Sequence, residues 1–182
     1  MEAQFQEDTA PERTRLIRMG SLMALILSSG LLCADWLMVP DRFTAALQWS
    51  LLLYAPVLCL SLAFTHRVPL QWRESIGLIN SLVAAGILVY LCVSSTDELA
   101  GPYLVSLSMI VLFNGGVTRV RFWLALQIDL IVLGLFAWAA MAIPHANVPV
   151  MVGQALILLA SSLFTLHNSY ALEREERTNW LM

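Results

Sequence analysis

An all-α integral membrane protein, a bundle of six transmembrane helices, is the fold class that the sequence predicts. Three observations support it. Of the 182 residues, 59% are hydrophobic and only 13% are charged, whereas a soluble domain carries about 25% charged residues. The apolar residues fall into six separate runs, each close to the length that a helix needs to cross a bilayer. The arginines gather in alternate connections between the runs, a pattern typical of multi-pass proteins.

The six runs predict helices, because lipid offers no hydrogen-bond partners to an exposed backbone. Their expected ranges are 17–39, 44–64, 75–94, 103–117, 122–143 and 150–171. Pro56 lies inside the second run, so we expect it to kink that helix. Five other prolines fall between the runs, where a missing N–H costs little: Pro40, Pro69, Pro102, Pro144 and Pro149.

The arginines also predict the orientation. There is no lysine, and every arginine except Arg42 lies on one side of the membrane if the N-terminus is cytoplasmic. Basic residues in short loops resist transfer across the membrane, so we expect both termini in the cytoplasm. The organisation that follows is a cytoplasmic tail (1–15, with residues 1–12 disordered), a six-helix membrane domain (16–171) and the start of a cytoplasmic helix (172–182).

Polar residues inside the runs are the candidate site. Asp129 lies about two turns, or about 10 Å, into the fifth run, and an acid at such a depth is by default a functional hypothesis. Asn80 and Asn114 lie at a similar depth, and His167 lies slightly nearer the cytoplasm. We interpret these four residues as a ligand-binding or switch layer, in which Asp129 binds a ligand or a proton or forms a hinge. The alternative is helix packing, with a neutral Asp129 donating one hydrogen bond.

The remaining reactive side chains give weaker signals. His145 falls on the opposite side from His66 and His167, so the three histidines cannot share one ion and no metal site is predicted. Cys33, Cys59 and Cys92 lie in apolar runs. We interpret them as three buried free thiols. The alternative is a disulfide between Cys33 and Cys92, which both lie near the outer face of the membrane.

Enzymatic and nucleic-acid motifs are missing from these residues. We therefore predict no catalytic residue, no cofactor within this segment and no nucleic-acid partner.

The sixth run continues without glycine or proline through residues 168–182. We therefore expect one helix to leave the membrane and to continue beyond Met182 towards a further domain. Six residues of this run and its continuation follow the a/d spacing of a heptad repeat: Leu163, Leu166, Tyr170, Glu173, Arg177 and Trp180. Two of them are charged, so the spacing is weak evidence for a coiled coil.

Six short-looped spans followed by SYALEREERTNWL resemble the membrane region of bacterial signalling cyclases. In that family a Tyr, a Leu-Glu-Arg group, a second Arg and a hydrophobic residue lead into a cytoplasmic GGDEF diguanylate cyclase domain or a class III adenylate cyclase domain. The matching residues here are Tyr170, Glu173, Arg174, Arg177 and Leu181. The resemblance implies a bacterial inner membrane, a homodimer, and a following catalytic domain that uses Mg²⁺ and a nucleoside triphosphate.

The leading hypothesis is a sensory and dimerisation module in the lipid bilayer. A small apolar or amphipathic ligand would bind among the helices, and the sixth helix would pass the signal to the output domain. The alternatives are an adenylate cyclase membrane domain, the input domain of a sensor histidine kinase, a small transporter and a structural anchor.

Overall fold

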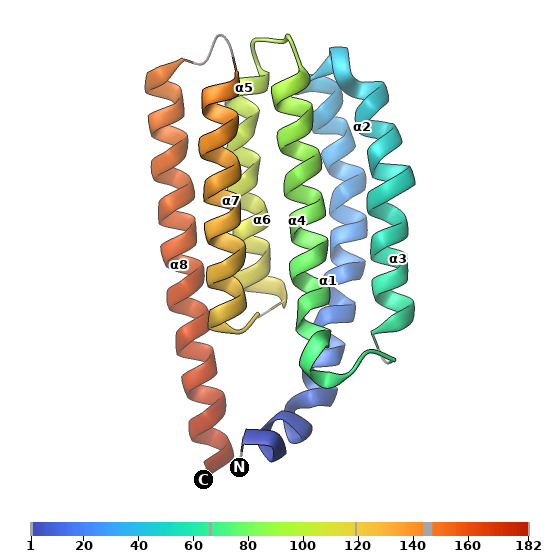
Figure 1. Ribbon diagram of the computed structural model, residues 1–182, viewed down its shortest axis with the longest axis vertical. Helices are drawn as coiled ribbons and strands as arrows, with labels where there is room; N and C mark the ends of the chain where they lie inside the picture. The colour runs from blue at the N-terminus through green and yellow to red at the C-terminus, as the bar shows by residue number, and fades with distance from the viewer. Residues whose placement is uncertain (1, 66, 119, 144–146, 182) are drawn as a thin grey trace.

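The computed structural model describes residues 2–65, 67–118, 120–143 and 147–181. Helices form all of the regular structure in these ranges, and they run side by side as one bundle (Figure 1). The predicted all-α fold class is therefore confirmed. Six segments are long and apolar enough to cross a membrane: Thr14–Met38, Pro40–Phe64, Ser75–Ser94, Ala100–Thr118, Phe122–Ala142 and Val148–Thr178. Both termini lie at one end of the bundle, called the terminal end below, and the opposite end is called the far end.

Helix α1 (Glu2–Met38) begins much earlier than predicted. The expected disorder of residues 1–12 is wrong for the described part, which is helical from Glu2. The residues of this stretch are mainly Glu, Gln, Ala and Arg, which are good helix formers, so the helix of the first span extends outwards through them. The start of α1 turns aside from the bundle axis (Figure 1), and Pro11 lies inside this helix.

The second span is made of four short elements. They are the 3₁₀ turn η1 (Pro40–Arg42), α2 (Phe43–Trp49), the π-helical turn η2 (Ser50–Tyr54) and α3 (Ala55–Phe64). Pro56, expected to kink the helix, is the second residue of α3, which follows the π-helical turn directly. Proline cannot donate to the carbonyl four residues before it, and the wider turn occurs where that bond is missing.

Helix α4 (Leu70–Ser94) forms the third span, and Pro69 precedes it as predicted. The fourth span is again composite: α5 (Ala100–Tyr103), the 3₁₀ turn η3 (Leu104–Ser106), α6 (Leu107–Phe113) and the π-helical turn η4 (Asn114–Thr118). Pro102 lies inside α5 and not before it, because proline is tolerated in the first turn of a helix.

The last two spans are α7 (Phe122–Ala142) and α8 (Val148–Leu181). Pro149, expected in the preceding loop, is the second residue of α8, where its missing N–H is again harmless. The expected continuity of the sixth span with the exit helix is confirmed, because α8 runs without interruption to Leu181.

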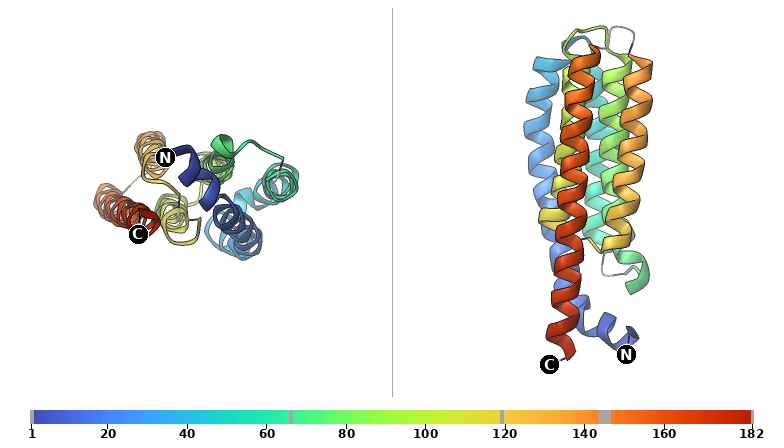
Figure 2. Two further views of the ribbon diagram at one scale, coloured as in Figure 1. Left: turned by 90° about the horizontal axis from the view of Figure 1, so that it is seen from below. Right: turned by 90° about the vertical axis from the view of Figure 1, so that its left-hand side faces the viewer.

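Helix α4 is the centre of the bundle. It packs against α1, α3, α6 and α7, while α8 packs outside on α6 and α7. Figure 2 shows this arrangement from below. The buried core lies mostly among α4, α6 and α7, and it includes Leu88, Leu107, Ile128 and Val132.

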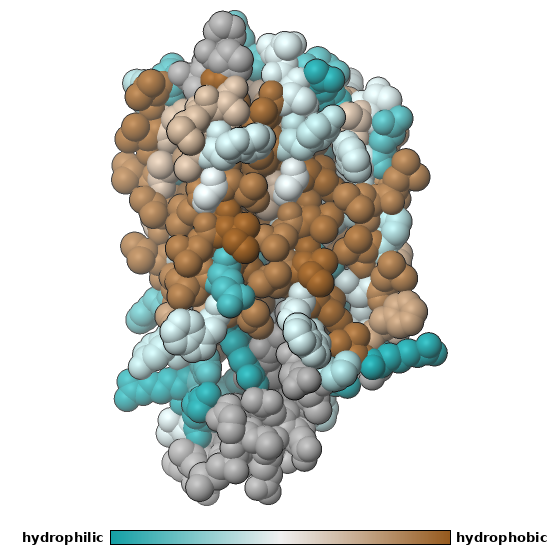
Figure 3. All heavy atoms as spheres, in the orientation of Figure 1, coloured by the Kyte–Doolittle hydropathy of each residue, from teal (hydrophilic) through white to brown (hydrophobic). Residues whose placement is uncertain are grey.

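On the face that Figure 3 shows, the surface is mainly apolar over the middle of the bundle and polar towards its ends. The three cysteines are free, but only Cys92 is buried, and Cys33 and Cys59 are exposed. The prediction of three buried thiols is therefore wrong for two of them, because each lies on the outward face of its helix.

Candidate functional site

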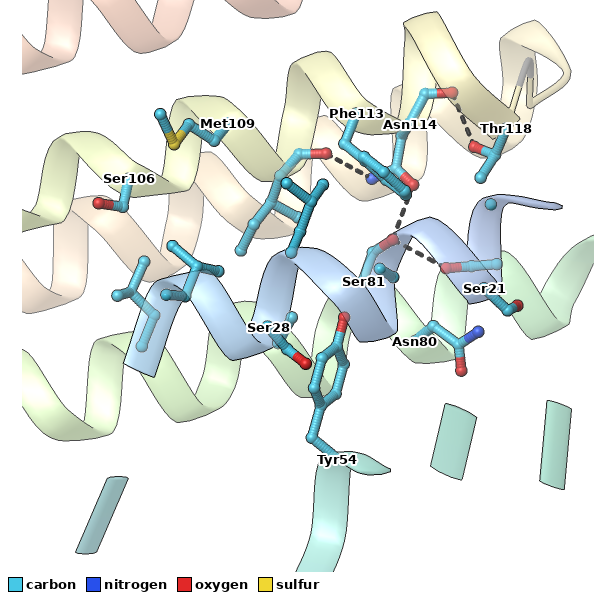
Figure 4. Close-up of a pocket in the computed structure, with 18 of the residues that line it drawn as sticks. Ser21, Ser28, Tyr54, Asn80, Ser81, Ser106, Met109, Phe113, Asn114 and Thr118 are labelled. Atoms are coloured by element: carbon cyan, nitrogen blue, oxygen red, sulfur yellow. Dashed lines mark hydrogen bonds between the residues drawn. The ribbon is translucent and has the colours of Figure 1, made fainter. Parts of the chain in front are cut away.

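A cavity of ≈ 170 Å³ lies between α1, α4 and α6. Its wall is mainly apolar, and a few hydroxyl and amide groups project into it (Figure 4). Leu27, Leu31 and Met109 line it and are also exposed on the outside of the bundle. The cavity is therefore open sideways, towards the surface that would face lipid. A cavity of about 150 Å³ in another protein binds benzene, so this one has room for a small molecule.

Small residues form part of the α1 wall of the cavity. Gly20, Ala24 and Ser28 follow each other at four-residue spacing and therefore lie on one face of the helix. This spacing is visible in the sequence and would have identified the wall.

A hydrogen-bonded pair forms the polar corner of the cavity. The Ser81 hydroxyl of α4 donates to Asn114 Oδ1 over 2.7 Å, and Asn114 Nδ2 donates to the carbonyl of Ile110 over 2.9 Å. Asn114 is also the first residue of η4. Figure 4 shows these bonds at the edge of the cavity. The pair ties α4 to the point where α6 widens into a π-helical turn, and such turns are frequent at functional sites.

Asn80 lines the same cavity but points to another partner. Its Oδ1 accepts a hydrogen bond of 2.9 Å from the hydroxyl of Ser61 in α3. Tyr54, the last residue of η2, completes this side of the wall. The structure therefore brings the predicted residues Asn80 and Asn114 to one cavity, each bonded to a serine of a neighbouring span.

The turn η4 lies in close contact with α1 on one side and α8 on the other. A Cβ atom on Gly20 would lie 2.6 Å from Thr118 Cγ2, and one on Gly115 would lie 2.5 Å from Thr165 Cγ2. Asn168 Nδ2 also donates to the carbonyl of Gly115 over 3.2 Å. Only glycine permits such close approaches, so the cavity wall and α8 are joined through η4.

The exit part of α8 contacts the start of α7. The ring of Tyr170 meets that of Phe122 edge-on at 6.1 Å, and Glu173 Oε2 accepts a bond of 3.4 Å from the Phe122 amide. Glu173 also pairs with Arg177 over 3.1 Å. Arg174 is exposed, and the side chain of Leu181 lies outside the described residues. The predicted output residues are thus held against α7 at Tyr170 and Glu173.

Two members of the predicted layer lie elsewhere. Asp129 is buried in α7 with only 2% of its surface exposed, and it is not among the residues that line the cavity. Within the described residues neither of its carboxylate oxygens has a hydrogen-bond partner. His167 is exposed on the outside of α8, because it lies on a different face of that helix from the buried Thr165. The predicted single layer is therefore divided among three places: the cavity, the buried face of α7 and the outside of α8.

The described residues contain no group of His, Cys, Asp or Glu side chains arranged to hold a metal ion; His66 and His145 lie outside them. The cavity offers neutral donors and acceptors and no charged side chain. It therefore suits an uncharged molecule with a polar group at one end. Comparison of the chain with protein-family models, with curated proteins and with solved structures finds no match.

Proposed function

We propose that this chain is the sensory and dimerisation module of a signalling protein in the bacterial inner membrane, with its terminal end in the cytoplasm. A small apolar or amphipathic ligand enters the cavity between α1, α4 and α6. Its polar group competes for the bond between Ser81 and Asn114. The observation that carries the proposal is that Asn114 begins η4, which contacts α8 through Gly115.

A change at Asn114 reaches α8 by a short physical path. If the Asn114 side chain turns to the ligand, η4 loses its bond to α4 and can shift along α8. Thr165 and Asn168, the α8 residues that contact this end of the fourth span, then move with it. A ligand shifts such an equilibrium only by its differential affinity for the two arrangements, and the Ser81–Asn114 bond supplies that difference.

The exit helix and the resemblance of its residues to those of signalling cyclases support a diguanylate cyclase as the output domain. Such cyclases act when two catalytic halves face each other, so the module works as a homodimer. The outward face of α8 supports pairing along this helix, because exposed apolar residues recur there at spacings of four, three, four and seven, which suit a heptad pattern: Val152, Leu156, Leu159, Leu163 and Tyr170.

A cross-linking experiment in native membranes tests the path from the cavity to α8. Leu163→Cys is introduced into a chain whose exposed Cys33 and Cys59 are replaced by alanine, and disulfide-linked dimers are measured after mild oxidation. Gly77→Leu fills the cavity, since Gly77 lines it and has open space beside it. Gly86→Leu is the matched control, because this glycine of α4 also has open space but is exposed outside the cavity.

We expect disulfide-linked dimers to form. The rate of their formation should change several-fold with Gly77→Leu and should stay the same with Gly86→Leu. Native mass spectrometry of the purified chain should find a co-purifying small molecule that Gly77→Leu removes and Gly86→Leu retains. If Gly77→Leu and Gly86→Leu changed the cross-linking rate equally, the cavity would not be coupled to α8, and the proposed path would be wrong. A phosphatase reporter that becomes active when fused after Met182 would contradict the orientation.

A further inference from the structure

A second polar site lies apart from the cavity, at the contact of α7 with α8. Asp129 is its centre, and its neighbours on the buried face of α7 are apolar, among them Ala125, Ile128 and Val132. Neither carboxylate oxygen is hydrogen-bonded within the described residues. An ionised carboxylate in such surroundings costs several kcal/mol or more, so something must neutralise it.

The register of the two helices identifies what faces Asp129. α7 and α8 run antiparallel, and the contacts of Phe122 with Tyr170 and Glu173 fix their relative height. Seven residues along each helix is about 10 Å, which brings Asp129 level with the two turns of α8 between Ser162 and Ser169. Both serines are buried, and in the described part of the chain their hydroxyls have no partner either. Three polar side chains without hydrogen bonds therefore belong to one stretch of the contact.

Among the residues that the structure describes, no basic side chain pairs with Asp129. The helices packed on α7 are α4, α6 and α8, and the membrane-spanning parts of α4 and α6 carry no charged residue. The other titratable groups of these helices and their neighbours lie towards the ends of the spans or on the outside: Tyr90, Cys92, Tyr103, Arg121, His167, Tyr170 and Glu173. Among them, Tyr103 donates to Asp35, and Tyr170 and Glu173 contact Phe122. Divalent cations such as Ca²⁺ and Mg²⁺ take six or more oxygen ligands, more than one carboxylate and two hydroxyls supply.

We propose that Asp129 is a proton-binding site and that its proton holds α8 against α7. The neutral acid is tolerated in the closed contact. When the O–H bond breaks, the proton passes to water and the electron pair stays on the carboxylate, which must then be hydrated. Hydration requires α7 and α8 to separate at this level. Closed α8 thus binds the proton and displaced α8 releases it, so the position of the helix and the pH are linked.

The proton site stands without the ligand, but the two meet on α8. The two turns of α8 between Ser162 and Ser169 contain Thr165 and Asn168, which contact the turn η4 and α6. The proton therefore acts on one side of this stretch of α8 and η4 on the other. A proton-driven movement of α8 is measurable with the cavity empty, so failure of one proposal leaves the other intact.

Infrared spectroscopy of the full chain in lipid vesicles tests for the proton directly. A protonated carboxylic acid gives a carbonyl stretch that an ionised one lacks. We expect such a band at neutral pH, its loss as the pH is raised, and its absence from Asp129→Asn. Asp129→Glu should shift the band. Asp35→Asn is the control, because Asp35 is the other buried acid of the spans and accepts a bond from Tyr103.

A distance measurement tests the movement. Spin labels are placed on the exposed positions Leu130→Cys of α7 and Leu163→Cys of α8, with the natural cysteines replaced and the labelled chain diluted with unlabelled chain. The distance between labels should lengthen as the pH rises, and in Asp129→Asn it should stay short at every pH. An Asp129 without a carboxylic acid band at neutral pH would overturn the proton site. A distance that titrates equally in Asp129→Asn would overturn its control of α8.

Discussion

The two ends of this bundle satisfy their polar groups in opposite ways. At the far end, Asp41 Oδ1 accepts a bond of 2.6 Å from the Ser95 hydroxyl, and Oδ2 accepts one of 2.9 Å from the Thr96 amide. Arg42 Nε donates to the carbonyl of Ser94 over 2.8 Å. These contacts join the connection before α2 to the connection after α4, so two loops distant in sequence hold each other.

Deeper in the far end, side-chain bonds join spans. The Tyr103 hydroxyl donates to the buried Asp35 over 2.7 Å, and Gln154 Nε2 donates to the carbonyls of Gly101 and Pro102. α1 is thus tied to α5, and α5 to α8. Hydrogen bonds of this kind, made to buried groups, hold one geometry strongly.

The half of the bundle nearer the terminal end carries the features that permit change. It contains the cavity corner at Asn114, the π-helical turn η4, and Asp129, which has no hydrogen-bond partner among the described residues. If the movements that we propose belong to this half, the far end is the frame against which they occur. Stability and α8 position should therefore respond differently to substitutions in the two regions.

The largest change in stability and in α8 position is expected for a substitution at Gly115 of η4, and none is expected for the same substitution at the adjacent Gly116. Gly115→Ala places a Cβ against the stiff, buried Thr165 side chain, whereas Gly116→Ala meets open space. We expect Gly115→Ala to lower the free energy of unfolding by about 1–3 kcal/mol and to displace α8, and Gly116→Ala to do neither. Denaturant titration in detergent, followed by circular dichroism, measures the first, and cross-linking at Leu163→Cys measures the second. Equal behaviour of the two variants would remove η4 as the link.

Tyr103→Phe tests the frame. It removes the donor to Asp35 and leaves that buried carboxyl without the bond, so we expect a loss of about 1–3 kcal/mol in the free energy of unfolding. The α8 cross-link should be unchanged. Tyr90→Phe is the control, since Tyr90 is exposed and contacts Trp49 through its ring. If Tyr103→Phe also altered the cross-link, the far end would take part in signalling and the contrast would fail.

Ser81→Ala tests the cavity corner. It removes one donor to the buried Asn114, which should cost about 1 kcal/mol of unfolding free energy. In contrast to Tyr103→Phe, it should change the α8 cross-link, because Asn114 is freed from α4. Ser94→Ala in α4 is the matched control, since that hydroxyl bonds only within its own helix. A cross-link that is the same in both serine variants would contradict a role for Asn114.

The smallest expected effect is that of Asp41→Asn at the far surface. The amide keeps one acceptor oxygen of the two that bind Ser95 and Thr96, and the site is exposed. We expect a loss of about 0.5–1 kcal/mol in the free energy of unfolding and no change in α8. A larger loss than that of Tyr103→Phe, in the same denaturant titration, would reverse the order of importance within the frame.

Much of the fold could be predicted because it depends on local composition. The six spans and the continuity of α8 follow from apolar length and from the absence of helix breakers between Asn168 and Leu181. The length of the first helix could not be predicted in the same way. The charge and polarity of residues 1–12 indicate disorder, whereas the helix propensity of the same residues favours the extension of α1 through them.

The candidate site could be predicted only in part. Asn80, Asn114 and Asp129 were recognised as intramembrane polar residues, but their depth did not reveal which of them share a site. Asn80 and Asn114 line the cavity, Asp129 lies at the contact of α7 with α8, and His167 faces outwards. The importance of Gly115 depends on the distance to Thr165, which no pattern within either run contains.

The six apolar spans are a property of the sequence, because a backbone in lipid has to satisfy its hydrogen bonds within each helix. Which side chains meet depends on how the helices pack. Each helix carries apolar residues around its whole circumference, so its composition does not specify how it is rotated about its own axis. That rotation comes from close approaches such as Gly20 to Thr118 and from bonds such as Ser81 to Asn114, which form only once the helices are packed together.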